Sequence, residues 1–330
     1  MRLIGWKRIA LSIAAIALLL VPGHLVARGA PEEDLEYPSR PIEIVAPYNP
    51  GGATDMTARI LAAGLENELP VPVSIRNVAG AAGTIGTTEV LRSQPDGYTL
   101  LFNQGNLWTT KATGAVDFGP LDLSPVAQFG AGEFLFATRS DSDFETMEEM
   151  IAVLRQRPES LTMATNFGTL MHFAILMLQE AGGAEFHLVQ IGDGAERMSE
   201  VLGGHIDAAL FSTQEARDYY QAGEMTVLAV ASDQRLDDFP DVPTLAEQGL
   251  ATEFAVQQWQ WLLMPPGTPQ DRVNYIAAAV GRVIADPDVR AQLARLGASP
   301  VYRSGTELTN HMMSVGEVIL DIADRFGLAD

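Results

Sequence analysis

Short apolar stretches alternate with longer amphipathic ones along most of this chain. Runs rich in β-branched and aliphatic residues, bounded by turn residues, predict strands at 42–47, 71–77, 98–103, 134–138, 161–165, 186–190, 208–211, 227–231 and 261–264. Apolar residues at helical spacing predict helices at 56–68, 84–92, 147–157, 169–179 and 195–202, and a helical region from Pro269 onward. This alternation predicts an α/β protein with mostly parallel sheets.

Three helix starts are marked by capping residues. Thr146 stands three residues before Glu149, and Thr268 stands before Pro269 and three residues before Asp271. A hydroxyl followed by an acid at this spacing is typical of a capping box, and proline favours the first helical position. Asp286 followed by proline predicts a further start.

The first thirty residues have the layout of a secretory signal peptide. Arg2, Lys7 and Arg8 precede an apolar run at 9–21, and Gly23 and Ala27 are small enough for a cleavage site. The run is shorter than the roughly 20 apolar residues that a membrane-spanning helix needs. We therefore expect residues 1–30 to be removed on export.

The chain contains no cysteine. This excludes a disulfide framework, a thiolate metal site, a cysteine nucleophile and a lipid-anchored N-terminal cysteine. The formal net charge of −21 becomes more negative when the basic leader is removed, which argues against nucleic acid as a partner. We expect a soluble protein of the periplasm without a lipid anchor, with a secreted enzyme as the alternative.

The turn after the first predicted strand has the features of an anion site. Gly51 and Gly52 leave the backbone open to a ligand, and Thr54 and Asp55 are placed to cap the helix that follows. The first N–H groups of a helix have no internal partners, and the helix dipole favours negative charge there. The sequence therefore predicts a carboxylate or phosphate at this turn, although such a turn can also be only a connection.

A second turn repeats this arrangement. Asn166, Phe167 and Gly168 join a predicted strand to a helix that opens at Thr169, and a third turn around Gly192 precedes another helix. In open α/β sheets, ligands lie outside the carboxyl ends of the strands, where these turns fall. We expect one ligand to be held between the first two turns.

Catalytic and metal signatures do not match. The chain has no G-x-S-x-G elbow, H-E-x-x-H pair or Walker loop, and its histidines show no metal-ligand spacing. His172 is expected to be structural, and the glycine run from Gly80 to Gly86 is expected to pack closely on a strand. We expect no cofactor, no metal and no enzymatic activity. A hydrolase, or a sensor or adaptor that presents the loaded ligand, remains the alternative.

Landmarks throughout the chain resemble the Bug-type substrate-binding receptors of the tripartite tricarboxylate transporter family. They are Tyr37-Pro38, Arg40-Pro41, Pro50-Gly51-Gly52, Thr54-Asp55, Arg59, Asn77, Gly80, Gly83, Gly86, Pro95 to Leu100, His172, Leu202-Gly203-Gly204, Asp207, Leu228-Ala229-Val230, Asp241 to Thr244, Glu247, Gly249, Pro265 and Gly267-Thr268-Pro269. The resemblance implies a type II periplasmic binding protein fold, in which two α/β domains close on a small carboxylate. It also implies delivery of that ligand to the membrane permease subunits.

From the turns and the resemblance together we expect a monomer with domain 1 at 37–138 plus 259–330 and domain 2 at 139–258. The candidate ligand contacts are Tyr48, Asn49, Gly51, Gly52, Ala53, Thr54, Asp55, Gln104, Thr165, Asn166, Phe167, Gly168, Thr169, Gln190, Gly192 and Asp207.

Some positions depart from the family pattern. Phe167, Leu170 and Ile191 stand where the family is usually smaller or more polar, and Trp261 stands where glycine is common. These departures predict a less polar pocket that prefers an aromatic or longer-chain acid to citrate. The sequence does not identify the acid.

Overall fold

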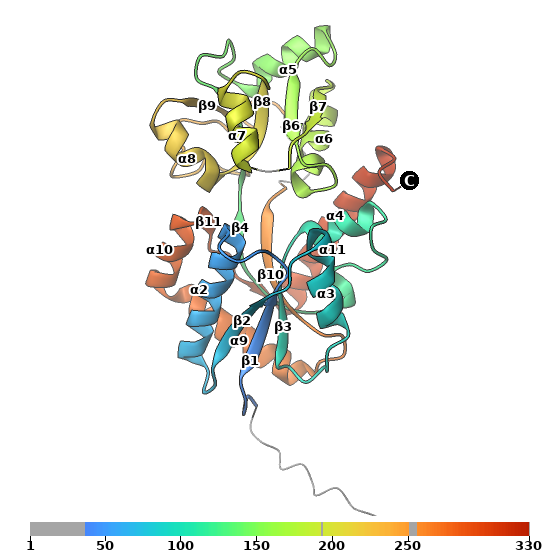
Figure 1. Ribbon diagram of the computed structural model, residues 1–330, viewed down its shortest axis with the longest axis vertical. Coiled ribbons are helices and arrows are strands. Elements are labelled where there is room, and N and C mark those ends of the chain that lie inside the picture. Colours follow the sequence, from blue (N-terminus) through green and yellow to red (C-terminus); the bar gives the residue numbers. More distant parts are fainter. Residues whose placement is uncertain (1–36, 193, 251–255, 330) are drawn as a thin grey trace, which may run out of the picture. The chain divides into compact units, whose positions relative to one another are not determined.

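Two β-sheets carry the fold in the computed structural model, which describes residues 37–192, 194–250 and 256–329 (Figure 1). The predicted signal peptide, residues 1–30, lies outside the described residues. Among the described residues, no helix has the length and apolar character needed to cross a bilayer.

The first sheet has the strand order β11-β4-β10-β3-β1-β2, with β12 beside β4. Its strands are β1 (Ile42–Ala46), β2 (Val73–Asn77), β3 (Thr99–Gln104), β4 (Ser124–Gly132), β10 (Gln258–Met264), β11 (Ala298–Ser299) and β12 (Arg303–Ser304).

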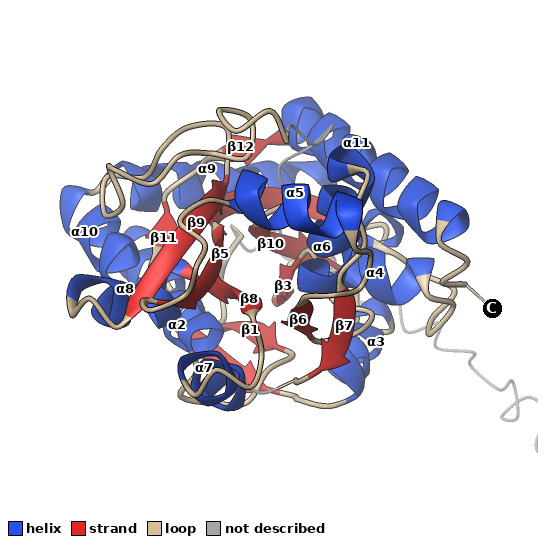
Figure 2. Ribbon diagram, turned by 90° about the horizontal axis from the view of Figure 1, so that it is seen from above, coloured by secondary structure: helices blue, strands red, loops and turns tan. Residues whose placement is uncertain are grey.

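Helices cover both faces of this sheet (Figures 1 and 2). On one face α2 (Ala53–Glu68), α9 (Gln270–Ala285) and α10 (Pro287–Arg295) pack on one another. The other face carries α3 (Thr84–Leu91), α4 (Asn106–Ala112) and α11 (Gly305–Arg325), with short 3-10 turns at η1 (Ala81–Gly83) and η2 (Pro120–Asp122).

The second sheet has the order β7-β6-β8-β5-β9. Its strands are β5 (Phe134–Arg139), β6 (Thr162–Thr165), β7 (His187–Gln190), β8 (Ala208–Ser212) and β9 (Met225–Ala231). Its helices are α5 (Met147–Gln156), α6 (Leu170–Gly182), α7 (Gly194–Leu202) and α8 (Thr213–Gln221).

The alternation of residues along β5 explains how the second sheet is covered. Phe134 and Phe136 join the core cluster that includes residues of α5 and α6, whereas Leu135 and Ala137 join a separate cluster with residues of α7 and α8. Successive side chains of a strand point to opposite faces. The strand is therefore apolar throughout because both of its faces are buried.

The chain passes from one sheet to the other at Glu133, which lies between β4 and β5, and it returns to the first sheet in β10. The sheets thus change at Glu133, whereas we expected a domain border after residue 138. Residues Pro38–Asp330 form one compact unit by their contacts, so the bounds of the two domains stay a prediction.

The expectation of mostly parallel sheets is wrong. β1 pairs in parallel with β2 and β3, and β6 with β7 and β8, but the strands that carry the chain between the sheets pair antiparallel. β5 carries the chain from the first sheet into the second, and β10 carries it back. Both strands run antiparallel to their neighbours in the sheet that they enter.

Of the caps expected at Thr146, Thr268 and Asp286, two form. Thr146 and Glu149 form the expected capping box, and the Asp286 side chain accepts from the Asp288 N–H. Thr268 does not cap α9, because the N-cap is Pro269 and the Thr268 hydroxyl donates to the carbonyl of Pro265.

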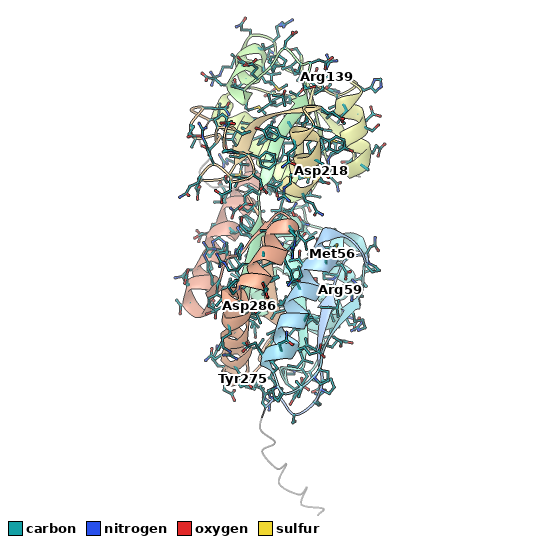
Figure 3. All side chains as sticks on the ribbon, turned by 90° about the vertical axis from the view of Figure 1, so that its left-hand side faces the viewer. Met56, Arg59, Arg139, Asp218, Tyr275 and Asp286 are labelled. Atoms are coloured by element: carbon teal, nitrogen blue, oxygen red, sulfur yellow. The ribbon has the colours of Figure 1, made fainter. Side chains whose placement is uncertain are left out.

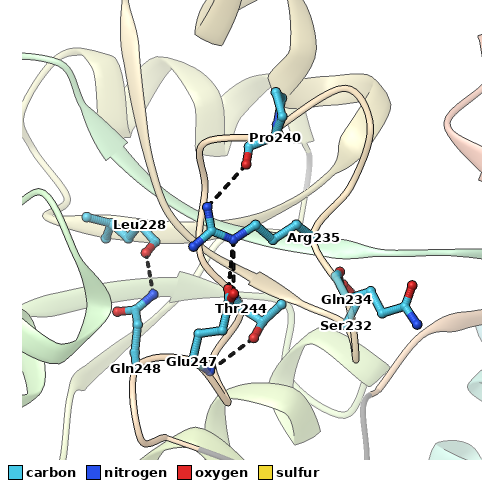
Figure 4. Close-up of polar contacts among 8 residues, drawn as sticks. All are labelled: Leu228, Ser232, Gln234, Arg235, Pro240, Thr244, Glu247 and Gln248. Carbon is cyan, nitrogen blue, oxygen red and sulfur yellow. Dashed lines mark hydrogen bonds and ion pairs between the residues drawn. The ribbon is translucent and has the colours of Figure 1, made fainter.

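The loop after β9 shows that one family landmark is structural (Figure 4). The Glu247 carboxylate accepts from the Thr244 N–H at 2.8 Å and from Arg235 Nε at 2.9 Å, while the Glu247 N–H donates to the Thr244 hydroxyl. The backbone bond from Thr244, followed by the contact with Arg235, lowers the pKa of Glu247. This reciprocal pair fixes a turn in the manner of a capping box.

Candidate ligand-binding site

The first turn leads from β1 into α2. Gly51 has a φ of 89°, which favours glycine, and Gly52 is the N-cap in an extended conformation. The helix begins at Ala53, so the expected capping role of Thr54 and Asp55 is wrong: they are the second and third helical residues. The first intrahelical bond runs from the Met56 N–H to the Gly52 carbonyl, so the preceding N–H groups have no helical partner. Figure 3 shows Met56 and Arg59 on this helix.

Asp55 is the centre of a hydrogen-bond network beneath this turn. Its Oδ2 accepts from the Gly51 N–H at 2.9 Å and from Arg59 Nε at 2.9 Å, and its Oδ1 accepts from Asn77 Nδ2 at 2.7 Å. The side chain is 2% exposed. Burial raises the pKa of Asp55, but the bonds from Arg59, Gly51 and Asn77 together outweigh it and lower the pKa. The Asp55 carboxylate therefore stabilises the turn by accepting these three hydrogen bonds.

A second network connects the turn to β3. The Gln104 N–H donates to the Tyr48 hydroxyl oxygen at 2.9 Å, and Gln104 Nε2 donates to the Thr54 hydroxyl at 2.9 Å. Burial raises the pKa of Tyr48 beyond its ordinary value, so the phenol is neutral. Gln104 thus fixes both ends of the first turn.

The second turn leads from β6 into α6. Asn166 accepts at its carbonyl from the N–H and the hydroxyl of Thr169, which is the N-cap of α6. Gly168 has a φ of 76°, and its N–H donates to His172 Nδ1 at 3.3 Å. The imidazole is therefore part of the turn, and burial lowers its pKa.

Gln190, at the end of β7, braces the second turn. Its Oε1 accepts from the Phe167 N–H at 2.7 Å, and its Nε2 donates to Asn166 Oδ1 at 3.0 Å. Gly192 follows so closely that a Cβ there would lie 3.7 Å from the Asn166 side chain. The second and third turns are thus in contact through Asn166.

The first and second turns both line a pocket of about 290 Å³. Its lining residues come from the first turn, the loop around η1, helix α4 and the second turn: Pro47, Tyr48, Asn49, Ala79, Gly80, Ala82, Gly83, Asn106, Thr109, Thr110, Asn166, Gly168 and Thr169. Five of the candidate contacts line it, namely Tyr48, Asn49, Asn166, Gly168 and Thr169.

The other candidates lie around this pocket or away from it. Gly51, Gly52, Thr54, Asp55 and Gln104 belong to the networks of the first turn, and Ala53 begins α2. Thr165, Phe167, Gln190 and Gly192 are neighbours of Asn166.

Asp207 is not brought to this place. Its carboxylate accepts from the N–H and hydroxyl of Thr162, at the start of β6, whereas the second turn follows the end of that strand. We therefore leave Asp207 out of the site.

Sequence reasoning missed the wall formed by the η1 loop and α4. The glycine run does pack on a neighbouring strand end, because a Cβ at Gly86 would lie 2.8 Å from the Val78 carbonyl and 3.0 Å from the Pro47 side chain. The same loop also lines the pocket. Ala81 and Ala82 have positive φ angles of 46° and 53°, a conformation that is rare for alanine and that no sequence pattern announces.

The expected apolar wall is largely absent. Leu170 is 2% exposed and Ile191 is 8% exposed, and both belong to the hydrophobic cores. Trp261 is also buried. Phe167 is exposed, with its ring edge-on to His172 at 5.0 Å. The expectation of a less polar pocket is therefore wrong for Leu170 and Ile191, which are packing residues.

Metal-binding geometry is not found within the part of the chain that the structure describes: no group of three or more histidine or acidic side chains is placed to hold an ion.

Comparisons with known proteins identify the family and the fold. The sequence profile of the tripartite tricarboxylate transporter family receptor matches residues 57–316. BugT of Bordetella pertussis is 30% identical over 292 residues, which are 86% of this chain and 89% of BugT.

Two solved structures extend the comparison. A TctC solute-binding protein from Polaromonas is 29% identical with a TM-score of 0.78, and the match covers 88% of this chain and 99% of that one. MatC from Rhodopseudomonas palustris, solved with bound malate, is 25% identical with a TM-score of 0.68, and the match covers 89% of this chain and all of MatC, at 100%. These likenesses confirm the predicted two-domain α/β fold class.

Proposed function

Because the chain belongs to the tripartite tricarboxylate transporter receptor family, we propose that it captures a small organic carboxylate between its first and second turns. The observation that carries this proposal is the pocket of about 290 Å³ that both turns line. It is close to the lower end of the roughly 300–1,000 Å³ typical of small-molecule sites, which favours a small ligand.

The chemistry of the lining suits an anion held by neutral donors. None of the residues that line the pocket in the described structure carries a charged side chain. Thr169 occupies the N-cap position of α6, and Asn106 is the first residue of α4, so the pocket adjoins the starts of two helices. The N–H groups in the first turn of α6 have no intrahelical partner before the bond from Phe173 to the Thr169 carbonyl.

The remaining donors are uncharged side chains. Asn49 and Asn106 carry amide groups that can donate, whereas the hydroxyls of Thr109 and Thr110 donate to carbonyls of their own helix. We therefore assign the carboxylate oxygens to the first N–H groups of α2 and α6 and to the asparagine amides, with no arginine clamp. The remaining candidate contacts, apart from Asp207, form or stabilise the two turns.

MatC supports the ligand class, since that relative holds malate. For the present chain we propose the periplasm as location, given the basic and apolar leader and the absence of cysteine. We also propose that the loaded receptor delivers its ligand to the permease subunits of a tripartite transporter and that it acts as a monomer without catalysis.

A thermal-shift screen tests the binding proposal. Protein refolded to remove bound ligand is heated with malate, adipate or citrate, and with malamide as the uncharged control. We expect a saturable rise in melting temperature with at least one acid and none with malamide, because a ligand that binds only the native state stabilises it. No rise with any acid would contradict the proposal.

Two further measurements separate the alternatives. Recovery of the bound acid unchanged after incubation is expected of a receptor, whereas a hydrolase would consume its ligand. Solution scattering with and without the confirmed acid is expected to show a smaller radius of gyration in the loaded protein, as hinge closure of two domains requires. Identical scattering curves would contradict closure. Uptake of the acid into permease-containing vesicles that does not depend on the receptor would favour a sensor or adaptor.

A further inference from the structure

Arg197, in the first turn of α7, is a buried charge that the pocket itself does not use. The residue is 3% exposed, and its Nη1 donates to the carbonyls of Ile191 at 3.4 Å and Gly192 at 3.2 Å. Both carbonyls belong to the third turn, which follows β7 at the carboxyl end of that strand. The guanidinium thus lies beneath this turn and holds it from the inside.

The ion pair beneath the turn is loose. The carboxylate of Glu215 lies 3.6 Å from Arg197 Nη2, and its other oxygen accepts from the N–H and hydroxyl of Ser212 in the capping box of α8. Arg197 Nε has no hydrogen-bond partner among the described residues. A buried guanidinium with an unused donor and a distant counter-ion is a poor source of stability, since apolar side chains often replace such pairs without loss.

The close approach of the backbone shows that the turn is built around this pair. A Cβ at Gly194 would lie 2.1 Å from Glu215 Oε1 and 3.5 Å from Arg197 Nη2, so the position leaves no room for a side chain. Arg197 lies on α7 and Glu215 on α8, so their ion pair connects these two helices next to the third turn.

The orientation of the peptide group between Ile191 and Gly192 determines where the Gly192 N–H points. In a trans peptide the carbonyl and the N–H point opposite ways. Because the Ile191 carbonyl faces Arg197, the Gly192 N–H points away from the guanidinium. Gly192 is exposed and lies against Asn166, which lines the pocket.

We propose that Arg197 is a positioning residue that aims the Gly192 N–H at an anionic group of the ligand next to Asn166. The proposal rests on the proposed carboxylate function. The positive charge of Arg197, which Glu215 offsets only in part from 3.6 Å, also favours a negative group on the far side of the turn, in a pocket whose own side chains are neutral. A ligand with a second carboxylate gains most from this turn, so the third turn selects dicarboxylates over monocarboxylates.

Calorimetry with malate as the probe tests this assignment. Arg197→Met is expected to raise the Kd for malate at least tenfold, and Arg197→Lys, which keeps the charge but cannot reproduce the planar contacts, is expected to raise it less. Arg217→Met is the matched control, because Arg217 also has an Nε without a described partner and contacts a main-chain carbonyl, that of Ala294, away from the turns. Its Kd is expected to stay within twofold of the unmodified protein.

The outcomes are distinguishable. An unchanged Kd for Arg197→Met, in a protein that binds malate, overturns the positioning role. If Arg197→Met does not fold, the Lys variant decides, and a Kd within twofold of the unmodified protein overturns the role. If the unmodified protein binds no acid, the proposed function fails, and the inference is judged by amide exchange of Ile191, whose N–H donates to the Thr165 carbonyl at 2.8 Å. Faster exchange in Arg197→Met than in Arg217→Met is expected, and equal exchange contradicts the role.

Discussion

Replacement of Asp55 by asparagine tests whether this buried carboxylate organises the first turn. In the variant, one of the two side-chain oxygens becomes an NH2 group that cannot accept. If the remaining oxygen keeps the bonds from Gly51 and Arg59, the new NH2 group faces Asn77 Nδ2, and two donors meet at a contact that is now 2.7 Å. Asn77 cannot simply turn its amide over, because its Nδ2 also donates to the Tyr48 carbonyl and its Oδ1 accepts from Arg59.

The expected cost follows from the bonds that are lost. A hydrogen bond to a charged group contributes about 1.5–3 kcal/mol, and one such bond, that of Asn77, has no replacement in the variant. The Arg59 side chain is half exposed, so water screens its ion pair with Asp55, and we assign no contribution to the loss of the negative charge there. We therefore expect Asp55→Asn to lower the free energy of unfolding by about 1.5–3 kcal/mol.

The effect also has a defined pH dependence. The pKa of Asp55 in the folded protein lies below the unfolded value of 3.8. A carboxyl group of this kind stabilises the fold above the unfolded pKa, and its contribution is lost as the pH falls through the folded pKa. The gap between the unmodified protein and the variant is therefore expected to narrow below pH 4.

Urea unfolding followed by circular dichroism at pH 7 and at pH 3 measures both effects. Asp141→Asn is the control, because that side chain is 77% exposed and its ion pair with Arg139 lies at the surface. A loss at pH 7 no larger than in the control, or a gap that stays constant down to pH 3, would refute the role of Asp55 as the centre of this network.

Three further predictions concern other parts of the chain. Gly52→Val is expected to abolish carboxylate binding with little change in melting temperature, since Gly52 has an ordinary φ of −76° and open space around it. Gly51→Ala, by contrast, should lower the free energy of unfolding by roughly 1–2 kcal/mol, because the φ of Gly51 is 89°. Unchanged affinity of the valine variant in calorimetry would contradict the assignment of the carboxylate to the first turn. Gly316→Ala places a Cβ 2.6 Å from Trp108 Cζ2 and should destabilise the fold by about 1–3 kcal/mol in thermal unfolding. A melting temperature equal to that of Gly52→Ala would contradict this prediction and show that α11 can shift to accommodate the methyl group. Burial lowers the pKa of His311 to about 4, so stability is expected to fall as the pH drops from 6.5 towards 4, and an NMR titration midpoint near 6.5 would disprove it.

Local patterns predicted the elements whose signals are confined to their own residues. The capping box of Thr146 and Glu149 forms as expected, and the strands that bring the chain to the first and second turns end where the sequence predicts, within two residues. The sequence did not predict β4, because Pro125, Gly130 and Gln128 interrupt its apolar pattern. Gln128 is nevertheless fully buried, since Arg303 of β12 donates to its amide oxygen at 3.0 Å.

The sequence by itself determined the α/β architecture, the glycine-containing turns at strand ends and the family, because each depends on residue order within a short window or on landmarks along the chain. Only the tertiary structure decided which turns share a pocket. It placed the Asp207 carboxylate against Thr162, at the start of β6, and away from the pocket. It also showed that the η1 loop and α4 form one wall of the pocket. Whether a side chain faces a ligand or a core depends on partners far away in the chain, as Leu170 and Arg197 show, and no local pattern contains that information.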